Sequence, residues 1–526
     1  MDLNEFTVIG GLQIRSADSI SGKYINSPND AMKIYKYIGI QLSKYKLDNL
    51  LVKIHDALLH DEFPEYPKFV FASLIKFMLL NCTMHSELSS MPEEELEEFL
   101  RMITEYELYD PDFSKNLRAD PKKTAASYLL KGAGQLQWDR NIGFMISRTL
   151  YIYEELIRDA GAPQFVKDIV NSRFEKNFGY SLHDFIKVGA ILWAGSISHN
   201  GGMRRDYIDK ARNKGMPVPN EEIVKACLKD LAIDQEGFRK DNLFRKFNVN
   251  PLLRYPLIRL WEKSEDELPF DDKFIAPFPD MIIYRITIGL YYQMYNYYKL
   301  DFATNFGDLF ELYVDKIINR LNIPGRIVSE KEIDSILPIK GGKGGNPKKR
   351  PDWVVFTDKG VILIECKATH YTQDTFERGI DARKTGWLSQ IKKSLDQFGE
   401  FERKLPQLCE IIGEDYTTEK KIQRVIVSFE PLLGLKNGPL KNYIDGNKEQ
   451  DWILISSEEF EAIQPYIAKG YDLWSFILEY KSTPYHNFFK ILEKMKLKTG
   501  AQDNENMFYE YRNKIFNELL KNADDE

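Results

Sequence analysis

Hydrophobic and polar positions divide the chain into two regions with different periodicities. From about residue 28 to residue 300, apolar residues recur at three- and four-residue spacing, as in DAMKIYKYIGIQLSKYKLDNLLVKIHDALL (30–59). This spacing predicts helices. After residue 300, short apolar runs alternate with amphipathic segments, and that order predicts an α/β domain. The pattern as a whole predicts an α+β protein with more than one domain.

The second region contains a specific order of predicted elements. They are a helix over 305–321 with Asn305 as its N-cap, strand-like segments at 327–333, 352–356 and 361–368, a helix near 384–404, and strands at 424–429 and 452–456. A turn at 358–360 joins the second strand to the third. We therefore expect a helical region over 1–300, an α/β domain with a central mixed sheet over 301–470, and a C-terminal helical segment over 471–526.

Composition narrows the class of protein. A chain of 526 residues is long enough for several cores, and its net charge of −7 gives no general attraction to polyanions. Four widely spaced cysteines without a C-x-x-C pair favour reduced thiols in a cytoplasmic protein. The N-terminus lacks the pattern of a signal peptide. The most apolar stretches, 69–82 and 281–298, each carry a charge, so we expect buried helices and no membrane association.

Polar residues interrupt the apolar strand VILIECKA (361–368). Alternation places Glu365 and Lys367 on one face of this strand. The preceding strand begins beside Asp352, and a short turn would pair the two strands and bring Asp352 close to Glu365. Two carboxylates and one ammonium are then expected at the same end of the sheet.

A divalent cation would offset the repulsion between these carboxylates. Mg²⁺ prefers oxygen ligands and often binds one or two carboxylates together with waters and a substrate phosphate, and we expect Mn²⁺ to substitute for it. Such a cation lowers the pKa of a bound water and neutralises charge on a phosphodiester. Lys367 would orient the water or stabilise the developing negative charge.

These residues resemble the core motif PD-x(n)-(D/E)-x-K of the PD-(D/E)XK nuclease superfamily, whose fold is restriction-endonuclease-like. Pro351 and Asp352 match its first half, and Glu365, Cys366 and Lys367 match its second half. The resemblance implies that Asp352 and Glu365 bind the catalytic metal and that Lys367 assists the nucleophile. It covers about residues 300–470 and does not reach the N-terminal half.

The resemblance implies two more site residues on neighbouring helices. Many members carry an acid on the helix before the core hairpin, and Glu311, at the edge of the apolar stripe of that helix, is the residue expected there. It would support a second metal or a metal-bound water. Related nucleases often have a glutamine or lysine on the helix after the lysine strand. Gln390 and Gln397 share a face of that helix, and Gln390 is the one selected.

The segment KGGKGGNPKKR (340–350) precedes the Pro-Asp pair and contains five basic residues and no acid. It lacks the order of an NTP-binding P-loop. Lys343, Lys348, Lys349 and Arg350 are therefore expected to contact a nucleic-acid backbone, although a solvated turn would have the same composition.

The sequence thus predicts a metal-dependent endonuclease, with DNA favoured over RNA because the superfamily mostly cleaves DNA. A role in antiviral defence is expected from a likeness to prokaryotic nucleases with helical N-terminal extensions. The helical region would bind substrate, a partner protein or a second copy of the chain, or would restrain the nuclease until a partner or ligand engages it. The alternatives are a catalytically silent nucleic-acid-binding or scaffold subunit and a DNA repair or recombination nuclease.

Overall fold

The computed structural model of the protein describes most of the chain. The described residues are 28–66, 68–108, 120, 123, 142–198, 202–204, 206–240, 251–260, 273–337, 350–369, 386–415, 421–431, 439–445, 451–483, 488–502, 505–509, 511 and 513. The fold combines many helices with two mixed sheets, so the prediction of the α+β class is confirmed.

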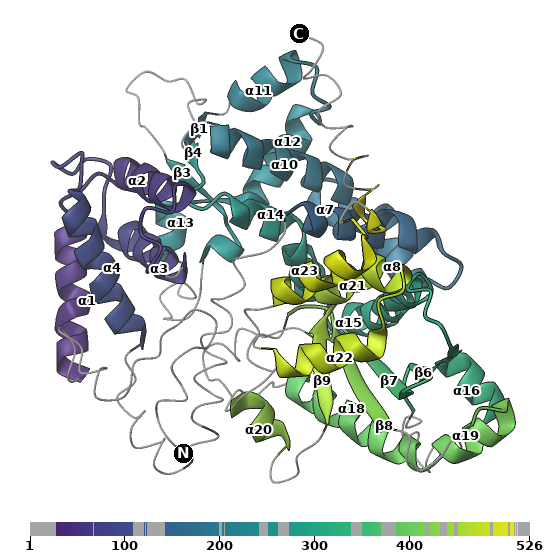
Figure 1. Ribbon diagram of the computed structural model, residues 1–526. Coiled ribbons are helices and arrows are strands. Elements are labelled where there is room, and N and C mark those ends of the chain that lie inside the picture. Colours follow the sequence, from purple (N-terminus) through teal and green to yellow (C-terminus); the bar gives the residue numbers. More distant parts are fainter. Residues whose placement is uncertain are drawn as a thin grey trace.

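Helices make up most of the N-terminal region, as the three- and four-residue spacing predicts. They are α1 (Pro28–Leu42), α2 (Leu47–Leu59), α3 (Lys68–Asn81), α4 (Glu93–Leu108), α7 (Ile142–Leu150), α8 (Gln164–Asp168), α9 (Phe174–Phe178), α10 (Leu182–Ser198), α11 (Asp206–Asn213), α12 (Glu221–Leu231), α13 (Gln235–Lys240) and α14 (Asp280–Ile286). Short 3-10 or π-helical turns lie between some of them: η2 (Tyr151–Glu155), η3 (Leu156–Arg158), η4 (Ile169–Arg173) and η5 (Pro251–Leu253). Helices α1 to α4, in purple, form one end of the molecule in Figure 1.

The sequence pattern did not predict a small sheet in this region. Its four strands are β1 (Gly202–Arg204), β2 (Ala232–Asp234), β3 (Leu257–Leu260) and β4 (Lys273–Ile275). They lie in the order β1-β4-β3-β2, with β2 and β3 parallel and the other neighbours antiparallel. Strands of three or four residues are too short to show an alternating pattern.

The two most apolar stretches are buried helices, as predicted. Most side chains of α3 are buried, and the second stretch forms α14 and the first part of α15 (Ile288–Ile318). Among the helices that the structure describes, none combines the length and the hydropathy needed to cross a bilayer.

Helix α15 crosses the predicted domain boundary at residue 300. Two helical segments meet at Lys299 within α15, so a helix does start near the predicted boundary, but it already includes Asn305, and the prediction of Asn305 as its N-cap is wrong. The helix is kinked at Lys299, whose φ of 56° and ψ of −134° are far from helical values. The amide of Asn305 donates to the Asp301 carbonyl inside the helix and caps nothing.

The C-terminal half contains a five-stranded mixed sheet, as predicted. Its strands are β5 (Arg326–Ser329), β6 (Trp353–Thr357), β7 (Gly360–Lys367), β8 (Lys421–Ser428) and β9 (Trp452–Ser456), in that spatial order. The first three are antiparallel to one another, and β7, β8 and β9 run parallel. The tight turn between β6 and β7 needs Gly360, because a Cβ there would lie 2.3 Å from the Lys421 carbonyl oxygen.

The prediction of a strand over 327–333 is correct for its first three residues and wrong for the rest. Strand β5 ends at Ser329, and α16 (Glu330–Ile336) begins at the next residue. Ser329 caps this helix: its hydroxyl accepts from the Glu332 N–H, and the Glu332 carboxylate accepts from the Ser329 N–H. The sequence S-x-x-E is the usual signature of this capping box.

Alternating side chains of the sheet enter two apolar clusters. Val354 and Leu363 pack against α16, α18 (Gly386–Glu402) and α19 (Leu405–Ile412) on one face. Val355 and Ile364 face the opposite cluster, which includes residues of α15 and of the helices after β9. The predicted two-residue alternation in β7 is therefore confirmed, and Glu365 and Lys367 belong to the α18 face.

The remaining helices follow β8 and β9. They are α20 (Pro439–Asp445), α21 (Ser457–Ala468), α22 (Leu473–Ser482) and α23 (Phe488–Thr499). The last three, drawn in yellow in Figure 1, lie near α15 and β9. Their buried apolar residues belong to the same cluster as those of α1 to α4, so a continuous core joins the N-terminal region to one face of the sheet.

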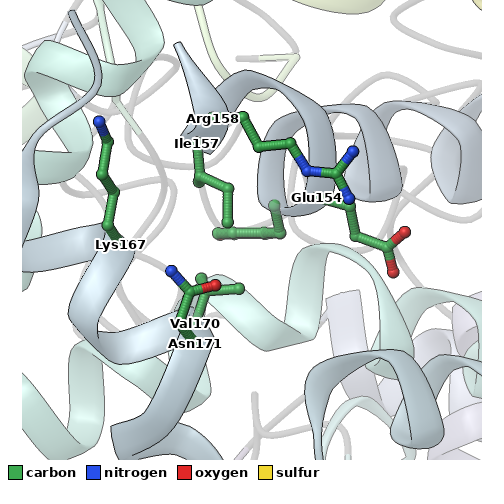
Figure 2. A pocket seen from close by; sticks show the side chains of 7 residues that line it. Glu154, Ile157, Arg158, Lys167, Val170 and Asn171 are labelled. Carbon is green, nitrogen blue, oxygen red and sulfur yellow. The ribbon is translucent and has the colours of Figure 1, made fainter. Parts of the chain in front are cut away.

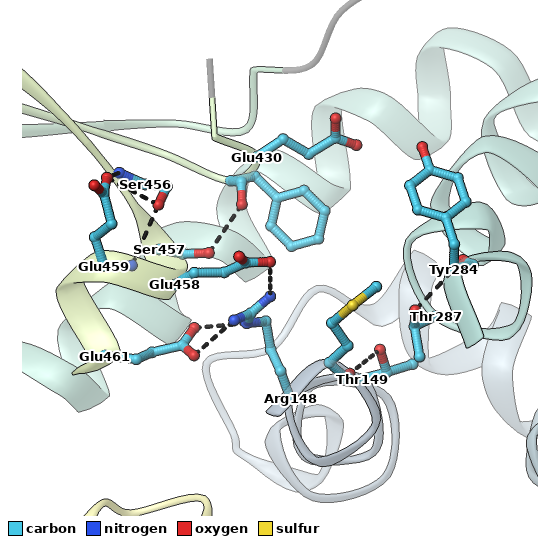
Figure 3. Close-up of polar contacts among 12 residues, drawn as sticks. Arg148, Thr149, Tyr284, Thr287, Glu430, Ser456, Ser457, Glu458, Glu459 and Glu461 are labelled. Carbon is cyan, nitrogen blue, oxygen red and sulfur yellow. Dashed lines mark hydrogen bonds and ion pairs between the residues drawn. The ribbon is translucent and has the colours of Figure 1, made fainter. Parts of the chain in front are cut away.

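A buried ion pair accompanies this core (Figure 3). The guanidinium of Arg148 on α7 donates to both carboxylate oxygens of Glu461 on α21, at 2.6 and 2.8 Å, and to Glu458 at 3.1 Å. The hydroxyl of Tyr313 on α15 donates to the same Glu461 carboxylate. Three elements far apart in sequence thus meet at one carboxylate.

Candidate active site

The β6–β7 hairpin brings the two halves of the sequence motif together. Trp353 pairs with Ile364, so Asp352 lies beside the end of β7 that carries Glu365. The Cys366 N–H donates to Asp352 Oδ2 at 2.7 Å. Both Asp352 and Glu365 are buried, with 8 % and 1 % of their surfaces exposed.

Two further acids approach Asp352 from neighbouring helices. Glu311 comes from α15 and Glu330 is the first residue of α16. One carboxylate oxygen of each lies within 4.8 Å of the others and of an Asp352 oxygen. We call Glu311, Glu330 and Asp352 the carboxylate trio. The Glu330 N–H also donates to the Asp352 backbone carbonyl at 2.7 Å, which fixes the start of α16 against β6.

Glu365 lies beside the trio but is not part of it. Lys367, two residues further along the same face of β7, donates from Nζ to Glu365 Oε1. Glu365 Oε2 is buried and has no hydrogen-bond partner among the described residues. The metal set expected from the sequence was Asp352, Glu365 and Glu311. The structure brings Asp352 and Glu311 together with Glu330, and the β6–β7 hairpin places Glu365, paired with Lys367, beside Asp352.

The electrostatics of the site reflect crowded carboxylates, of which Asp352 and Glu365 are buried and Glu311 and Glu330 half-buried. Burial, followed by the charge of Asp352, raises the pKa of Glu311 to about 8 and that of Glu365 to about 8. Burial also raises the pKa of Asp352 and of Glu330 above their ordinary values. The carboxylates therefore favour their protonated forms unless a positive charge enters the site.

Lys367 stays charged in this setting. Burial lowers the pKa of its ammonium, but the neighbouring Glu365 and Asp352 outweigh burial and raise the pKa above its ordinary value. A lysine in this state cannot act as a base near neutral pH. It can donate hydrogen bonds and stabilise negative charge.

Arg350 provides a second positive charge at the edge of the site. Its guanidinium donates to Glu330 at 2.7 Å and to Asp334 at 2.8 Å, and only 9 % of its side chain is exposed. The structure therefore places Arg350 among acids of α16. Lys343, Lys348 and Lys349, predicted with it to contact nucleic acid, lie outside the described residues.

The two glutamines considered on α18 lie in different environments. Gln390 is on the exposed side of the helix. Gln397 is buried, and its amide donates to the Arg350 backbone carbonyl at 3.1 Å, while its Oε1 has no partner in the described part of the chain. The structure thus brings Gln397, and not Gln390, to the segment that leads into Asp352.

Sequence reasoning missed Glu330 and Asp334, and it selected Gln390 where the structure favours Gln397. The only available sign of Glu330 was the capping box, which places a helix start directly after β5. That sign gives the position of the helix but not its contact with Asp352. The contact depends on pairing between β5 and β6, which are separated by more than 20 residues of sequence.

The donors present fit a hard divalent cation. The trio offers carboxylate oxygens from three elements, and such oxygens are the ligands that Mg²⁺ and Mn²⁺ accept. The unpartnered Glu365 Oε2 supplies another buried oxygen close by. A cation would stabilise the ionised carboxylates against the burial and the repulsion that raise the pKa values of Glu311 and Glu365.

The chain was compared with protein-family models, with curated proteins and with solved structures, and none of the three comparisons gave a significant match.

Proposed function

We propose that the protein is a metal-dependent nuclease that hydrolyses phosphodiester bonds, with Mg²⁺ as its cofactor and DNA as its preferred substrate. The observation that carries the proposal is the carboxylate trio, Glu311, Glu330 and Asp352, beside the buried Glu365–Lys367 pair at one end of the mixed sheet. A cation held by these carboxylates would neutralise phosphate charge and activate a water, and the charged lysine beside them would stabilise the developing negative charge.

The order of elements around the site agrees with the resemblance. Asp352 directly precedes β6, the antiparallel partner β7 carries the Glu365-x-Lys367 segment, α18 follows, and β8 returns parallel to β7. The restriction-endonuclease-like fold was expected from the motif, and this arrangement supports it. The preference for DNA, the endonuclease activity and a role in antiviral defence rest on the resemblance.

Each residue has a distinct role in the proposed reaction. The trio would hold the cation, which when bound neutralises phosphate charge and lowers the pKa of a water. Lys367 would donate a hydrogen bond to the phosphate or to the attacking water from a position fixed by Glu365. Gln397 holds the backbone of Arg350, directly before Pro351 and Asp352, and so positions the approach to β6.

Cleavage assays test the proposal directly. Wild type, Asp352→Asn, Glu365→Gln and the exposed control Glu410→Gln are incubated with supercoiled plasmid, linear duplex, single-stranded DNA and RNA, each with Mg²⁺, Mn²⁺ or EDTA. Asparagine keeps an acceptor for the Cys366 N–H, so Asp352→Asn is expected to fold and to lose at least about 100-fold in activity. Glu410→Gln should cut like wild type.

The outcomes separate the alternatives. Conversion of closed circular plasmid by wild type, abolished by EDTA, supports an endonuclease. Wild type that binds DNA and Mn²⁺ but cuts none of the four substrates would overturn the nuclease proposal in favour of a silent binding subunit. Equal cutting by wild type and Asp352→Asn would place the activity elsewhere.

A further inference from the structure

The N-terminal region contains an open pocket of about 380 Å³ (Figure 2). Apolar side chains of Tyr153, Ile157 and Val170 line part of it. Pockets that bind small ligands start near about 300 Å³ and combine apolar walls with a few polar groups. Tyr153 is 3 % exposed, and its hydroxyl has no hydrogen-bond partner among the described residues. Because this hydroxyl has almost no exposed surface, it does not open into the pocket, and Tyr153 contributes to the lining through its apolar atoms.

The polar part of the lining has mixed charge. Arg158 and Lys167 are cations, Glu154 is an acid, and Asn171 carries an amide. The Arg158 side chain is 72 % exposed and pairs with Glu155 at 3.4 Å. Lys167 Nζ donates to the Asp159 carbonyl at 2.8 Å, and the Glu154 carboxylate contacts the His183 ring. In Figure 2, Lys167 and Arg158 stand on opposite sides of the apolar residues, with Asn171 below them. Two cations around an apolar floor suit an anion that also carries a ring.

Both walls of the pocket contain π-helical turns. Glu154 belongs to η2 and Asn171 to η4, and each turn interrupts an otherwise helical stretch. A π-helical turn is less favourable than α-helix and is frequently found at functional sites. Two of them facing one pocket indicate that the local backbone is shaped by the requirements of the pocket.

The pocket packs directly on α15, the helix that carries Glu311. Lys316 of α15 forms an ion pair with Asp159 at 2.7 Å, directly after η3. The rings of Tyr153 and Phe306 lie 6.3 Å apart. The Lys299 kink separates this part of α15 from the preceding part, and a positive φ at a lysine stores strain. Movement of the pocket walls would therefore act on the segment of α15 that places Glu311.

We propose that this pocket binds a nucleotide-sized ligand, a phosphate joined to an apolar ring system, and that its occupancy changes cation binding at the carboxylate trio through α15. The binding part stands on the pocket alone, and the effect on cleavage rests on the proposed nuclease function. Arg158, the more exposed cation, binds the phosphate, the apolar walls contact the ring, and Lys167 adds positive charge on the opposite side of the pocket. The Asn171 amide pairs with a donor or acceptor on the ring edge, and Glu154, which also contacts His183, accepts from a ring-edge donor. The ligand is either a free nucleotide or a product of nucleic-acid hydrolysis.

Calorimetric titration tests the binding. The probes are adenosine 5′-monophosphate, 2′-deoxyadenosine 5′-monophosphate, adenosine and inorganic phosphate, and the variant is Arg158→Ala/Lys167→Met. The matched control, Lys225→Ala/Lys240→Ala, removes two exposed cations that do not line the pocket. We expect both monophosphates to bind wild type and the control, and the pocket variant to bind at least about tenfold more weakly. Tighter binding of the deoxyribonucleotide would indicate a DNA product as the source.

Three results would overturn the binding proposal. They are no binding of either monophosphate to wild type, equal binding by the pocket variant, and binding of inorganic phosphate as tight as that of the nucleotides, which would mean a simple anion site. Thermal unfolding of the variant checks that it retains the fold.

A second titration tests the coupling. Mn²⁺ affinity is measured with and without saturating nucleotide, and a change of about fivefold or more is expected in wild type but not in the pocket variant. No change in wild type would overturn the coupling. Because the Mn²⁺ titration needs no cleavage, it tests the coupling even if the nuclease proposal fails. If the protein does cut DNA, plasmid cleavage with and without nucleotide tests both proposals together.

Discussion

Lys367 and Glu365 project from the same face of β7 and form an ion pair. The Glu365 side chain is 1 % exposed, and the Lys367 side chain is 20 % exposed. Removing the lysine leaves a buried acid without its cation. At about pH 9 Lys367→Met should therefore lower the free energy of unfolding by about 3–5 kcal/mol. At about pH 5 the loss should be smaller, because Glu365 is then protonated in both proteins.

Denaturant unfolding at both pH values measures this difference. The double variant Glu365→Gln/Lys367→Met removes both charges and should recover most of the loss, which completes a double-mutant cycle. A loss that is the same at both pH values would show that the stabilisation by Lys367 comes from packing of its aliphatic chain and not from its charge.

The raised pKa values also predict how the stability of the cation-free protein depends on pH. Folded Glu311 and Glu365 have pKa values of about 8 against an ordinary 4.5, so the folded state binds more protons than the unfolded state between these values. Stability therefore falls as pH rises from about 4.5 to about 8. Chemical unfolding over this range in EDTA should show the decline, and Glu311→Gln should flatten it.

Adding Mn²⁺ should reverse part of this decline. The cation binds the ionised carboxylates, so its stabilising effect should be larger at about pH 8 than at about pH 5, and binding should release protons. Calorimetry in buffers of different ionisation enthalpy counts these protons. A stabilisation by Mn²⁺ that does not depend on pH would contradict binding at the carboxylate trio.

Glu330 should contribute to cation affinity although the sequence motif does not include it. Glutamine keeps the backbone N–H that donates to the Asp352 carbonyl and an oxygen that can accept from Arg350, so Glu330→Gln should fold. We expect it to weaken Mn²⁺ binding by about tenfold or more. The exposed Glu410→Gln serves as the control. Unchanged affinity would limit the role of Glu330 to its ion pair with Arg350.

Local pattern explains what could be predicted at this site. The strand that carries Glu365 and Lys367, its alternation and the turn at 358–360 depend on neighbouring residues, and all agree with the structure. The two-residue period of a strand fixes which side chains share a face before any tertiary contact is known.

The parts that could not be predicted depend on contacts between distant segments. Glu330 reaches Asp352 because β5 pairs with β6, and Gln397 reaches the Arg350 backbone because α18 packs across the sheet. In sequence, Arg350 is the last residue of a basic run, and only the fold shows that it pairs with two acids of α16. The strands of three and four residues in the N-terminal sheet were missed because so few positions define no period.

The buried pair of Arg148 and Glu461 should be essential for joining the N-terminal region to the sheet. Their side chains are 5 % and 2 % exposed, and Arg148 also reaches Glu458. Arg148→Met leaves Glu461 with the Tyr313 hydroxyl as its remaining side-chain donor among the described residues, so we expect a loss of about 3–5 kcal/mol in the free energy of unfolding. Arg158→Ala, at a side chain that is 72 % exposed, serves as the control and should change the free energy of unfolding by less than about 0.5 kcal/mol.

Because one apolar cluster extends from α1 to α23, the Arg148→Met protein should still unfold in a single transition. Two separate transitions in calorimetry would show that the N-terminal region and the sheet fold independently.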